Sequence, residues 1–428
     1  MRSIPSSNCK TLFCLLTVAC QLASQLLATR LTAATFTPLG DLPGGEFESS
    51  ATALSADGSV VVGVGGPTGP EVFQPSQEVA DPILEAIRRE AIRREAIRRE
   101  AFRWSKTDGM MPLGELPGGK YFSVADAVSA DGLTIVGSSY SAESLVGFRW
   151  TKDAGMSSLG KPLDGTHSCS PHAVSADGSV IVGTCLSNLV FGETQRMVAF
   201  RWTQSEGMVL LGDLPSGFLK SQASAVSARG DIIVGSISKS SRFQEAFVWT
   251  ATEGVIRLGY LHDGDSRSDA SSVSLDGKTI VGYSSSTSLL RTPTSMRMWI
   301  TSEPAWQEDR REAFRWTKKD GMTALGDLPG GDYFSSARAV SADGTIVVGN
   351  SSSSPGSSTT FIWDSVNGMR DLRDVLVASG ADLSGWQLQD ACAISADGSC
   401  IVGTGRNPAG QREAWLARLN DSYDRVKK

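Results

Sequence analysis

The chain has 428 residues, a formal net charge of −6 and a pI of about 5.3. It holds no basic tract large enough for a nucleic-acid surface, so we expect no nucleic-acid partner. Only three histidines are present, His167, His172 and His262, which leaves few candidates for a catalytic base.

The first 34 residues have the features of a secretory signal peptide. Arg2 and Lys10 precede a mostly apolar stretch over 11–27, and Thr32-Ala-Ala34 offers a cleavage site. We therefore predict a signal peptide over 1–34 and a secreted, extracellular or periplasmic protein. A retained membrane anchor and a lipoprotein attached at Cys20 are the alternatives. No later segment is apolar enough to span a bilayer, so we expect no membrane span after signal removal.

Residues 35–420 repeat one pattern, marked each time by a Ser-x-x-Gly turn. The turns lie at 55–58, 129–132, 175–178, 227–230, 274–277, 341–344 and 395–398. Each unit also holds four short apolar runs, such as Ala337–Ser341, Thr345–Gly349, Glu312–Thr317 and Met322–Leu328. A period of roughly 45–50 residues with four strands per unit is typical of propellers. The sequence predicts an all-β, seven-bladed β-propeller over 35–420.

The order of the runs at the two ends predicts how the ring closes. Phe36–Leu42 has the pattern of an outermost strand and precedes the first innermost strand. The last unit ends with 413–419 and has no outermost strand of its own before the tail at 421–428. We predict that the N-terminal strand Phe36–Leu42 pairs with Trp415–Leu419 and completes the last blade, which leaves no open sheet edge.

Two units carry insertions, at about 64–99 and about 283–312. The first contains Glu85–Arg89 copied at 90–94 and 95–99. We interpret it as a solvated, partly helical protrusion, with a basic recognition arm as the alternative. The second contains Trp299 and Trp306, which either pack on a blade edge or stack on a ligand.

The four cysteines outside the leader are Cys169, Cys185, Cys392 and Cys400. If Ser175 faces Ser179 across its turn, then Cys169 faces Cys185 on the two flanking strands. A disulfide between them is plausible in an oxidising compartment, and two buried thiols are the alternative. By the same reasoning, Cys392 and Cys400 would not lie directly opposite each other on their two strands. No Cys-x-x-Cys spacing occurs, so we expect neither a metal site nor a cofactor.

Aromatic residues recur in the loops that lead from an outermost strand to the next innermost strand. Loops on a rigid scaffold carry most binding sites, and exposed aromatic rings stack on sugars or clamp peptides. Wedging between blades is the structural alternative. The candidate ligand-binding residues are Tyr121, Phe122, Phe218, Tyr333, Phe334, Trp299 and Trp306.

The repeated phrase resembles the HAF family of probable extracellular repeats of bacteria. Its clearest copy is Glu312-Ala-Phe-Arg-Trp316, Gly321-Met322, Leu325–Gly331, Ala339–Gly344 and Ile346–Gly349. The resemblance covers nearly all of 36–419. It implies a secreted or surface location and brings no catalytic residues with it. More loosely, the unit is similar to kelch repeats.

From these patterns we predict a monomeric binding module for a glycan or an extracellular protein, without catalysis. The alternative is an extracellular glycan lyase or hydrolase with a site in a central funnel. That alternative requires acids or histidines that differ between units at the funnel mouth. The scarcity of histidine and the absence of a nucleophile-elbow motif weigh against it. A purely structural envelope role is also open.

Overall fold

The computed structural model describes residues 33–44, 47–66, 99–119, 122–142, 144–161, 168–191, 194–212, 214–240, 242–289, 306–331, 333–353 and 358–420. Most of the expected leader and first insertion, and the whole tail, lie outside these ranges. The described chain is built of strands apart from one short helix, α3 (Leu372–Ala378). The all-β prediction is therefore confirmed.

The strands follow one another in groups of four, hydrogen-bonded in chain order. Four groups are separate antiparallel sheets. One contains β2 (Ser49–Leu54), β3 (Val60–Gly65), β4 (Glu100–Ser105) and β5 (Gly109–Pro112), and the next contains β6 (Ser123–Val128), β7 (Thr134–Tyr140), β8 (Leu145–Thr151) and β9 (Gly155–Ser158). A third contains β10 (Ser168–Val174), β11 (Val180–Phe191), β12 (Thr194–Thr203) and β13 (Gly207–Leu210), and a fourth contains β22 (Ser335–Val340), β23 (Ile346–Ser351), β24 (Thr359–Asp364) and β25 (Gly368–Asp371). Two further groups are joined by a parallel bridge between Gln244 and Arg267. The first contains β14 (Lys220–Val226), β15 (Ile232–Ser238), β16 (Gln244–Thr250) and β17 (Gly254–Gly259), and the second contains β18 (Arg267–Val273), β19 (Thr279–Leu289), β20 (Trp306–Thr317) and β21 (Gly321–Gly326).

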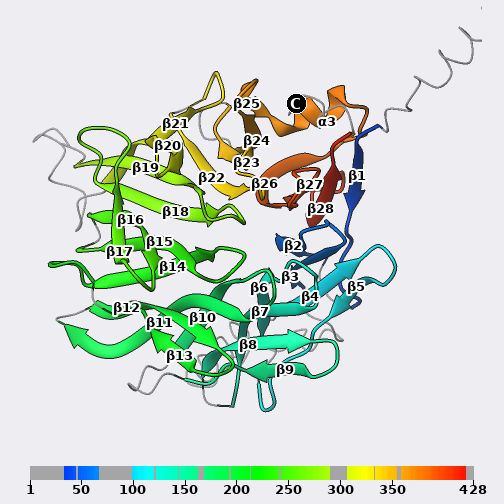
Figure 1. The fold of residues 1–428 in the computed structure, drawn as a ribbon. Helices are drawn as coiled ribbons and strands as arrows, with labels where there is room; N and C mark the ends of the chain where they lie inside the picture. Colours follow the sequence, from blue (N-terminus) through cyan, green and yellow to red (C-terminus); the bar gives the residue numbers. More distant parts are fainter. Residues whose placement is uncertain are drawn as a thin grey trace, which may run out of the picture.

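The last sheet takes its fourth strand from the beginning of the described chain. It contains β26 (Gln387–Ile394), β27 (Cys400–Arg406), β28 (Arg412–Arg418) and β1 (Thr35–Pro38). β1 runs antiparallel to β28, with Thr35 opposite Arg418 and Pro38 opposite Trp415. The Leu39 amide extends the pairing by donating to the Ala414 carbonyl at 3.0 Å. The first and last strands of the described residues, β1 and β28, thus lie side by side (Figure 1).

The sheets stand around a common centre, with the first strand of each group innermost (Figure 1). Neighbouring first strands contact one another in chain order, and β26 also contacts β2. Every residue of the second strand β3 is buried, because its sheet packs against neighbours on both faces. The third strands supply the largest fully buried side chains: Phe102, Phe148, Phe200, Phe247, Phe314, Phe361 and Trp415.

The Ser-Ala-Asp-Gly turns join first and second strands. Ser55 Oγ accepts the Val60 amide at 2.9 Å and donates to Asp57 Oδ1 at 2.7 Å. The fourth turn has Arg229 in place of the aspartate, and there Ser227 Oγ donates to Asp231 Oδ1 instead, at 2.7 Å. An aspartate two residues later therefore replaces the missing one. This exchange explains why the sequence tolerates the substitution.

The same turns are hydrogen-bonded to one another. In six of the seven turns the second residue donates its amide to the carbonyl of the equivalent residue in the next turn: Ala56 to Ala130, Ala130 to Ala176, Ala176 to Ala228, Ala228 to Leu275, Ala342 to Ala396, and Ala396 to Ala56, all at 2.9–3.2 Å. The last of these bonds links the final turn to the first. Repetition in sequence thus becomes a belt of backbone hydrogen bonds between sheets.

A buried serine at the start of most first strands ties each sheet to the preceding one. Ser123 Oγ accepts the Ala101 amide at 3.0 Å and donates to the Gly114 carbonyl at 2.9 Å. Equivalent bonds to a third-strand amide are made by Ser49, Ser221, Ser268 and Ser335. The hydroxyl group both accepts and donates a hydrogen bond, so it can be buried without leaving an unsatisfied polar atom.

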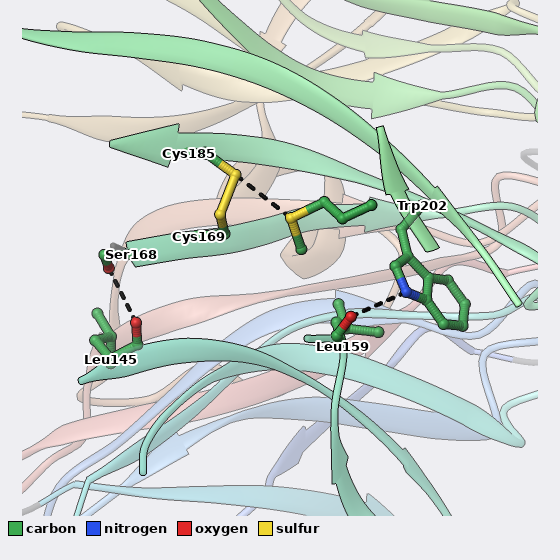
Figure 2. The surroundings of a disulfide bond; sticks show 7 residues. Leu145, Leu159, Ser168, Cys169, Cys185 and Trp202 are labelled. Atoms are coloured by element: carbon green, nitrogen blue, oxygen red, sulfur yellow. Dashed lines mark hydrogen bonds between the residues drawn. A yellow bond between two sulfur atoms is a disulfide. The ribbon is translucent and has the colours of Figure 1, made fainter. Parts of the chain in front are cut away.

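Cys169 and Cys185 are joined by a disulfide between β10 and β11 (Figure 2). They are direct cross-strand partners, as expected, but not for the reason expected. Beside the turn Val174 pairs with Ile181, one residue away from the register that places Ser175 opposite Ser179, and the register shift between Pro171 and Ala173 brings the two cysteines opposite each other. Met208 lies against the bridge, with its sulfur 3.5 Å from Cys185 Sγ. Cys392 and Cys400 are free thiols. The bond closes a short loop and restricts the unfolded chain.

Helix α3 follows β25, where the repeat departs from its usual Leu-Gly-Asp-Leu corner. Asp371 caps the helix by accepting the Arg373 amide at 2.8 Å. Leu372 and Leu376, four residues apart, are fully buried on one face. Arg373 Nη1 donates to the carbonyls of Leu383 and Trp386. The sequence pattern predicts strands in this unit and no helix, so α3 is a departure from the expectation.

The turn glycines are required for two separate reasons, which a pair of variants separates. Gly230 has φ +74°, and an added Cβ would lie 2.4 Å from a Val180 methyl of the neighbouring sheet, whereas Gly254 has φ +67° and open space around it. We expect Gly254→Ala to lose about 1 kcal/mol from its positive φ. Gly230→Ala should lose about 1–3 kcal/mol more because of the overlap. Urea unfolding measures both, and equal losses would contradict the close approach.

Candidate functional site

One position of the repeat departs from the regular ladder in every first strand. The register between first and second strands shifts at this residue, which forms a β-bulge, and β26 has a second shift between Leu388 and Asp390. We call these bulge residues the inner ring: Thr52, Asp126, His172, Ser224, Ser271, Arg338 and Cys392. Arg338 is exposed and the others are partly exposed.

The local sequence explains why the ring residues can differ. Six of the seven follow an alanine, such as the fully buried Ala125 and Ala223, and His172 follows Pro171. These neighbours carry the contact between sheets. A bulge turns its extra side chain out of the ladder, so that side chain has few packing constraints. The first strands lie innermost among the sheets (Figure 1), so these seven positions, which hold Thr, Asp, His, Ser, Arg and Cys, belong to the inner part of the fold.

His172 is held in one tautomer by a backbone carbonyl. Its Nδ1 lies 2.9 Å from the Ala223 carbonyl oxygen on the next first strand. A carbonyl only accepts, so Nδ1 carries the proton and Nε2 is left as the acceptor. Burial lowers the pKa of His172, and the Ala223 carbonyl and Asp269 oppose this. A neutral imidazole with an unprotonated Nε2 is suited to act as a general base.

Asp126 holds the equivalent position on the adjacent strand. Desolvation by the surrounding protein raises its pKa from 3.8 to about 7. The side chain is still partly accessible to solvent, so it is enclosed yet reachable. A carboxyl that titrates near neutrality can donate a proton to a leaving group or accept one.

Asp269 and Arg338 continue the polar region. Asp269 Oδ2 accepts from Gln244 Nε2 at 2.6 Å. Burial raises the pKa of Asp269, while hydrogen bonds from Ser236 and Gln244 and the charge of Arg338 act in the opposite direction. Asp269 therefore lies within electrostatic range of both His172 and Arg338. Its position is two residues before the bulge on β18.

Cys392 is the last member of the ring and is unsuited to nucleophilic attack. Its thiol donates to Asp390 Oδ2 at 3.5 Å. Burial, with Asp390 adding to it, raises the pKa of the thiol well above its usual value. The reactive form of cysteine is the thiolate, so Cys392 stays protonated near neutral pH.

The structure disperses the aromatic residues singled out from the sequence. Phe218 is buried beneath Lys239, whose Nζ is 4.7 Å from the ring centre, and it offers no free face. Phe122 packs edge-on against Tyr140, with ring centroids 5.5 Å apart. Tyr333 is 73% exposed. Phe334 faces the Arg311 guanidinium at 5.3 Å.

The other aromatic candidates are less informative. Tyr121 and Trp299 lie outside the described residues, and Trp306 is the first residue of β20. β19 and β20 extend as a paired ladder to Leu289 and Trp306, so both margins of the expected 283–312 insertion are strand.

Sequence reasoning missed the inner ring although the signal was present. The sequence analysis treated His172 only as one of three scattered histidines, but it lies inside β10. When the units are aligned on the Ser-x-x-Gly turn, the residue three positions before its serine differs from unit to unit. The residues on either side of it are mostly alanine. Periodicity alone does not show that this residue is bulged and partly exposed.

Two other features of the described residues bear on the location of a site. A hollow of about 470 Å³ lies where β1, β4 and β28 meet, lined among others by Arg103, Lys106 and Arg418. No inner-ring residue lines it, and Arg103 is already paired with Asp108 at 3.2 Å. Within the described ranges, no three His, Cys, Asp or Glu side chains are grouped to hold a metal ion. We therefore place the candidate site at the inner ring.

Comparisons with known proteins identify the fold. No family model matches the sequence, and no curated protein matches it. An oligogalacturonate lyase from Vibrio parahaemolyticus has a TM-score of 0.51 at 9% identity, over 92% of this chain and 99% of its own. A prolyl endopeptidase has a TM-score of 0.50 at 10% identity, over 97% of this chain and 56% of its own. The β-propeller domain of the Trilobed protease from Pyrococcus furiosus has a TM-score of 0.47 at 10% identity, over 90% and 95%.

The likenesses with TM-scores of 0.50 and 0.51, together with the four-stranded sheets, establish a fold of the β-propeller kind. They also correct one expectation. The prediction of a binding module without catalysis is wrong, because the similar structures are enzymes and favour the glycan lyase or hydrolase alternative. Asp126, Asp269 and His172 are acids and a histidine that differ between the units. No helix among the described residues is long and apolar enough to cross a membrane.

The raised pKa of Asp126 predicts how stability depends on pH. The folded protein keeps this proton up to about pH 7 and the unfolded chain releases it near 3.8, so stability falls as pH rises between these values. Asp126→Asn cannot ionise and removes that fall. We expect the stability lost between about pH 5 and about pH 8 to shrink by roughly 1–2 kcal/mol. Urea unfolding at both pH values measures it, with Ser224→Ala as the ring control that should change nothing.

Proposed function

We propose that this chain is a glycan-cleaving enzyme whose catalytic groups lie on the inner ring. The observation that carries the proposal is the variation of the bulge residues: one repeat position, at the centre of the fold, holds Asp126, His172 and Arg338. A structural role would favour one residue type throughout, as it does at the turn glycines. Oligogalacturonate lyases are among the proteins with a similar fold.

The chemistry we propose is elimination across the glycosidic bond of a carboxylated sugar. His172 Nε2 removes the proton beside the carboxylate, and Asp126, protonated below about pH 7, gives a proton to the leaving oxygen. A carbon–hydrogen and a carbon–oxygen bond break, and a carbon–carbon double bond forms. Arg338 binds the substrate carboxylate, and its planar guanidinium suits that task. The two proton-transfer residues are on the adjacent first strands β6 and β10.

The exposed Tyr333 and the neighbouring Phe334 are proposed to contact the sugar chain outside the ring. Arg311 is stacked against Tyr283 at 4.2 Å and Phe334 at 5.3 Å, and Arg310 lies 5.9 Å from the Tyr333 ring. Aromatic rings beside guanidinium groups suit a sugar that has both an apolar face and a carboxylate. Such a substrate fits an enzyme in the periplasm or outside the cell, where we propose it works.

We further propose that the sheets are seven blades closed into a ring around a funnel. Support comes from the pairing of β1 with β28, the bond from Ala396 to Ala56, and the contact of β26 with β2. Closure matters for catalysis because the inner ring has a single geometry only if all first strands are held together.

The activity is tested by incubating the full-length protein with polygalacturonate, alginate, hyaluronan and neutral glycans. Ultraviolet absorbance detects the unsaturated product of elimination. We expect His172→Ala to lower kcat/KM about 100-fold or more, because it removes the general base. Arg338→Ala should raise KM, because it removes the charge that binds the carboxylate.

The matched control is Ser224→Ala, at the same bulge position and without a proposed role, which should retain activity. The formation of new reducing ends without ultraviolet absorbance would indicate that the enzyme cleaves by hydrolysis and not by elimination. No product from any of these glycans, or full activity in His172→Ala, would refute the proposed function.

Ring closure is tested by deleting residues 33–42, which removes β1. The described sheets should then unfold together at a much lower temperature, because β28 loses its partner and the first and last sheets separate. Thermal melting followed by circular dichroism measures this, with Thr35→Ala as a control for a single exposed position. A truncated protein that melts like the parent would show that closure is not needed.

A further inference from the structure

Two equivalent contacts between neighbouring sheets are built from different residues. In the first, Asp269 of β18 meets Ser236 and Gln244 of the preceding sheet. In the second, the same repeat positions hold Asp390 of β26, with Asn350 and Ser358 in the preceding sheet. The two contacts differ at three positions: Gln244 corresponds to Ser358, Ser236 to Asn350, and Ala246 to Thr360.

In the first contact the long glutamine satisfies the aspartate. Gln244 Nε2 donates to Asp269 Oδ2 at 2.6 Å and to Ser236 Oγ at 2.9 Å. Its Oε1 accepts from Arg267 at 3.3 Å. The glutamine therefore spans the space between the aspartate and the second strand.

In the second contact Ser358 is too short to do this. Asn350 Nδ2 donates to the Gln389 carbonyl at 2.6 Å, so the asparagine faces β26 beside Asp390. Three buried oxygens there lack a hydrogen-bond partner: Asp390 Oδ1, Asn350 Oδ1 and Thr360 Oγ1. Asn350 is 8% exposed and Thr360 is fully buried.

The three oxygens are brought to one side of the sheet by the pairing. Asn350 and Thr360 are direct cross-strand partners, so their side chains share a face, and Asn350 shows that this face meets β26. Asp269 occupies the repeat position equivalent to Asp390, and its carboxylate contacts Gln244 of the preceding sheet. An aspartate at this position therefore points into the preceding sheet. Burying three oxygens without partners costs free energy, and a ligand that binds oxygen would recover it.

We propose that Asp390, Asn350 and Thr360 form a calcium site between the sheets of β22–β25 and β26–β28. A carboxylate, an amide oxygen and a hydroxyl are oxygen ligands of the kind that Ca²⁺ takes, and Ca²⁺ tolerates irregular geometry. The site sits beside Cys392 and Arg338 of the inner ring, and it goes beyond the proposed catalytic function. It would tie the first strand β26 to the second and third strands, β23 and β24, of the preceding sheet.

The nearby charges set the expected strength. Asp390 is the carboxylate of the site. Arg338 and Arg412 lie within electrostatic range of the adjacent Cys392, and both oppose a bound cation. We expect binding in the range of about 0.1–1 mM, as for extracellular calcium modules.

The experiment measures thermal unfolding of the full-length protein in EDTA and in millimolar CaCl₂, with MgCl₂ and NaCl for comparison, and calcium binding by titration calorimetry. Calcium should raise Tm by roughly 2–4 °C. Asp390→Asn should abolish both the shift and the binding heat. Asp269→Asn, at the equivalent contact already filled by Gln244, should leave the shift unchanged.

Ser358→Gln supplies the decisive variant because it restores the longer side chain. It should give a protein that folds, that is at least as stable in EDTA as the parent, and that no longer responds to calcium. No calcium-dependent shift and no binding heat in the parent would overturn the proposal. So would a shift that persists in both Asp390→Asn and Ser358→Gln. Neither readout depends on glycan cleavage, so the calcium site and the proposed function can fail separately.

Discussion

The hydrogen bond from one inner turn to the next is the interaction on which the rest of the structure depends. Each donating amide, such as that of Ala56, reaches the carbonyl of the equivalent turn in the neighbouring sheet. The turn can come that close only because its last residue is glycine: an added Cβ at Gly132 would lie 2.7 Å from Val60 of the preceding sheet. Conformation and contact thus both require the residue that every unit keeps.

Once the turns and buried serines hold the sheets, one position per unit is free to vary. The bulge residue is excluded from the ladder, and the alanines around it carry the packing. Thr52 and His172 illustrate the result: each reaches the carbonyl of an alanine on the next first strand, Ala125 or Ala223, but one is a hydroxyl and the other an imidazole. A rigid repeat can therefore present different chemistry from each unit at one place.

Much of the fold could be predicted from sequence because local patterns repeat. The strand content and the four-strand unit follow from turn positions and a period of two. The opposition of Cys169 and Cys185 depends in addition on the register shift between Pro171 and Ala173, which the sequence pattern does not show. Helix α3 could not be predicted as easily, since seven residues with two buried leucines do not establish a helical period. The aromatic candidates show the same limit: sequence placed Phe218 and Tyr333 in equivalent loops, but one is buried and the other exposed.

The sequence by itself determined the repeating unit, because the Ser-x-x-Gly turn and the short apolar runs act over a few residues and recur without change. Tertiary structure alone decided which residues meet. The raised pKa of Asp126, the tautomer of His172 and the unpartnered oxygens near Asp390 all arise from neighbours on other sheets, far away in the chain. Burial and hydrogen bonding depend on what surrounds a side chain in space, and spacing along a single sequence does not encode those surroundings.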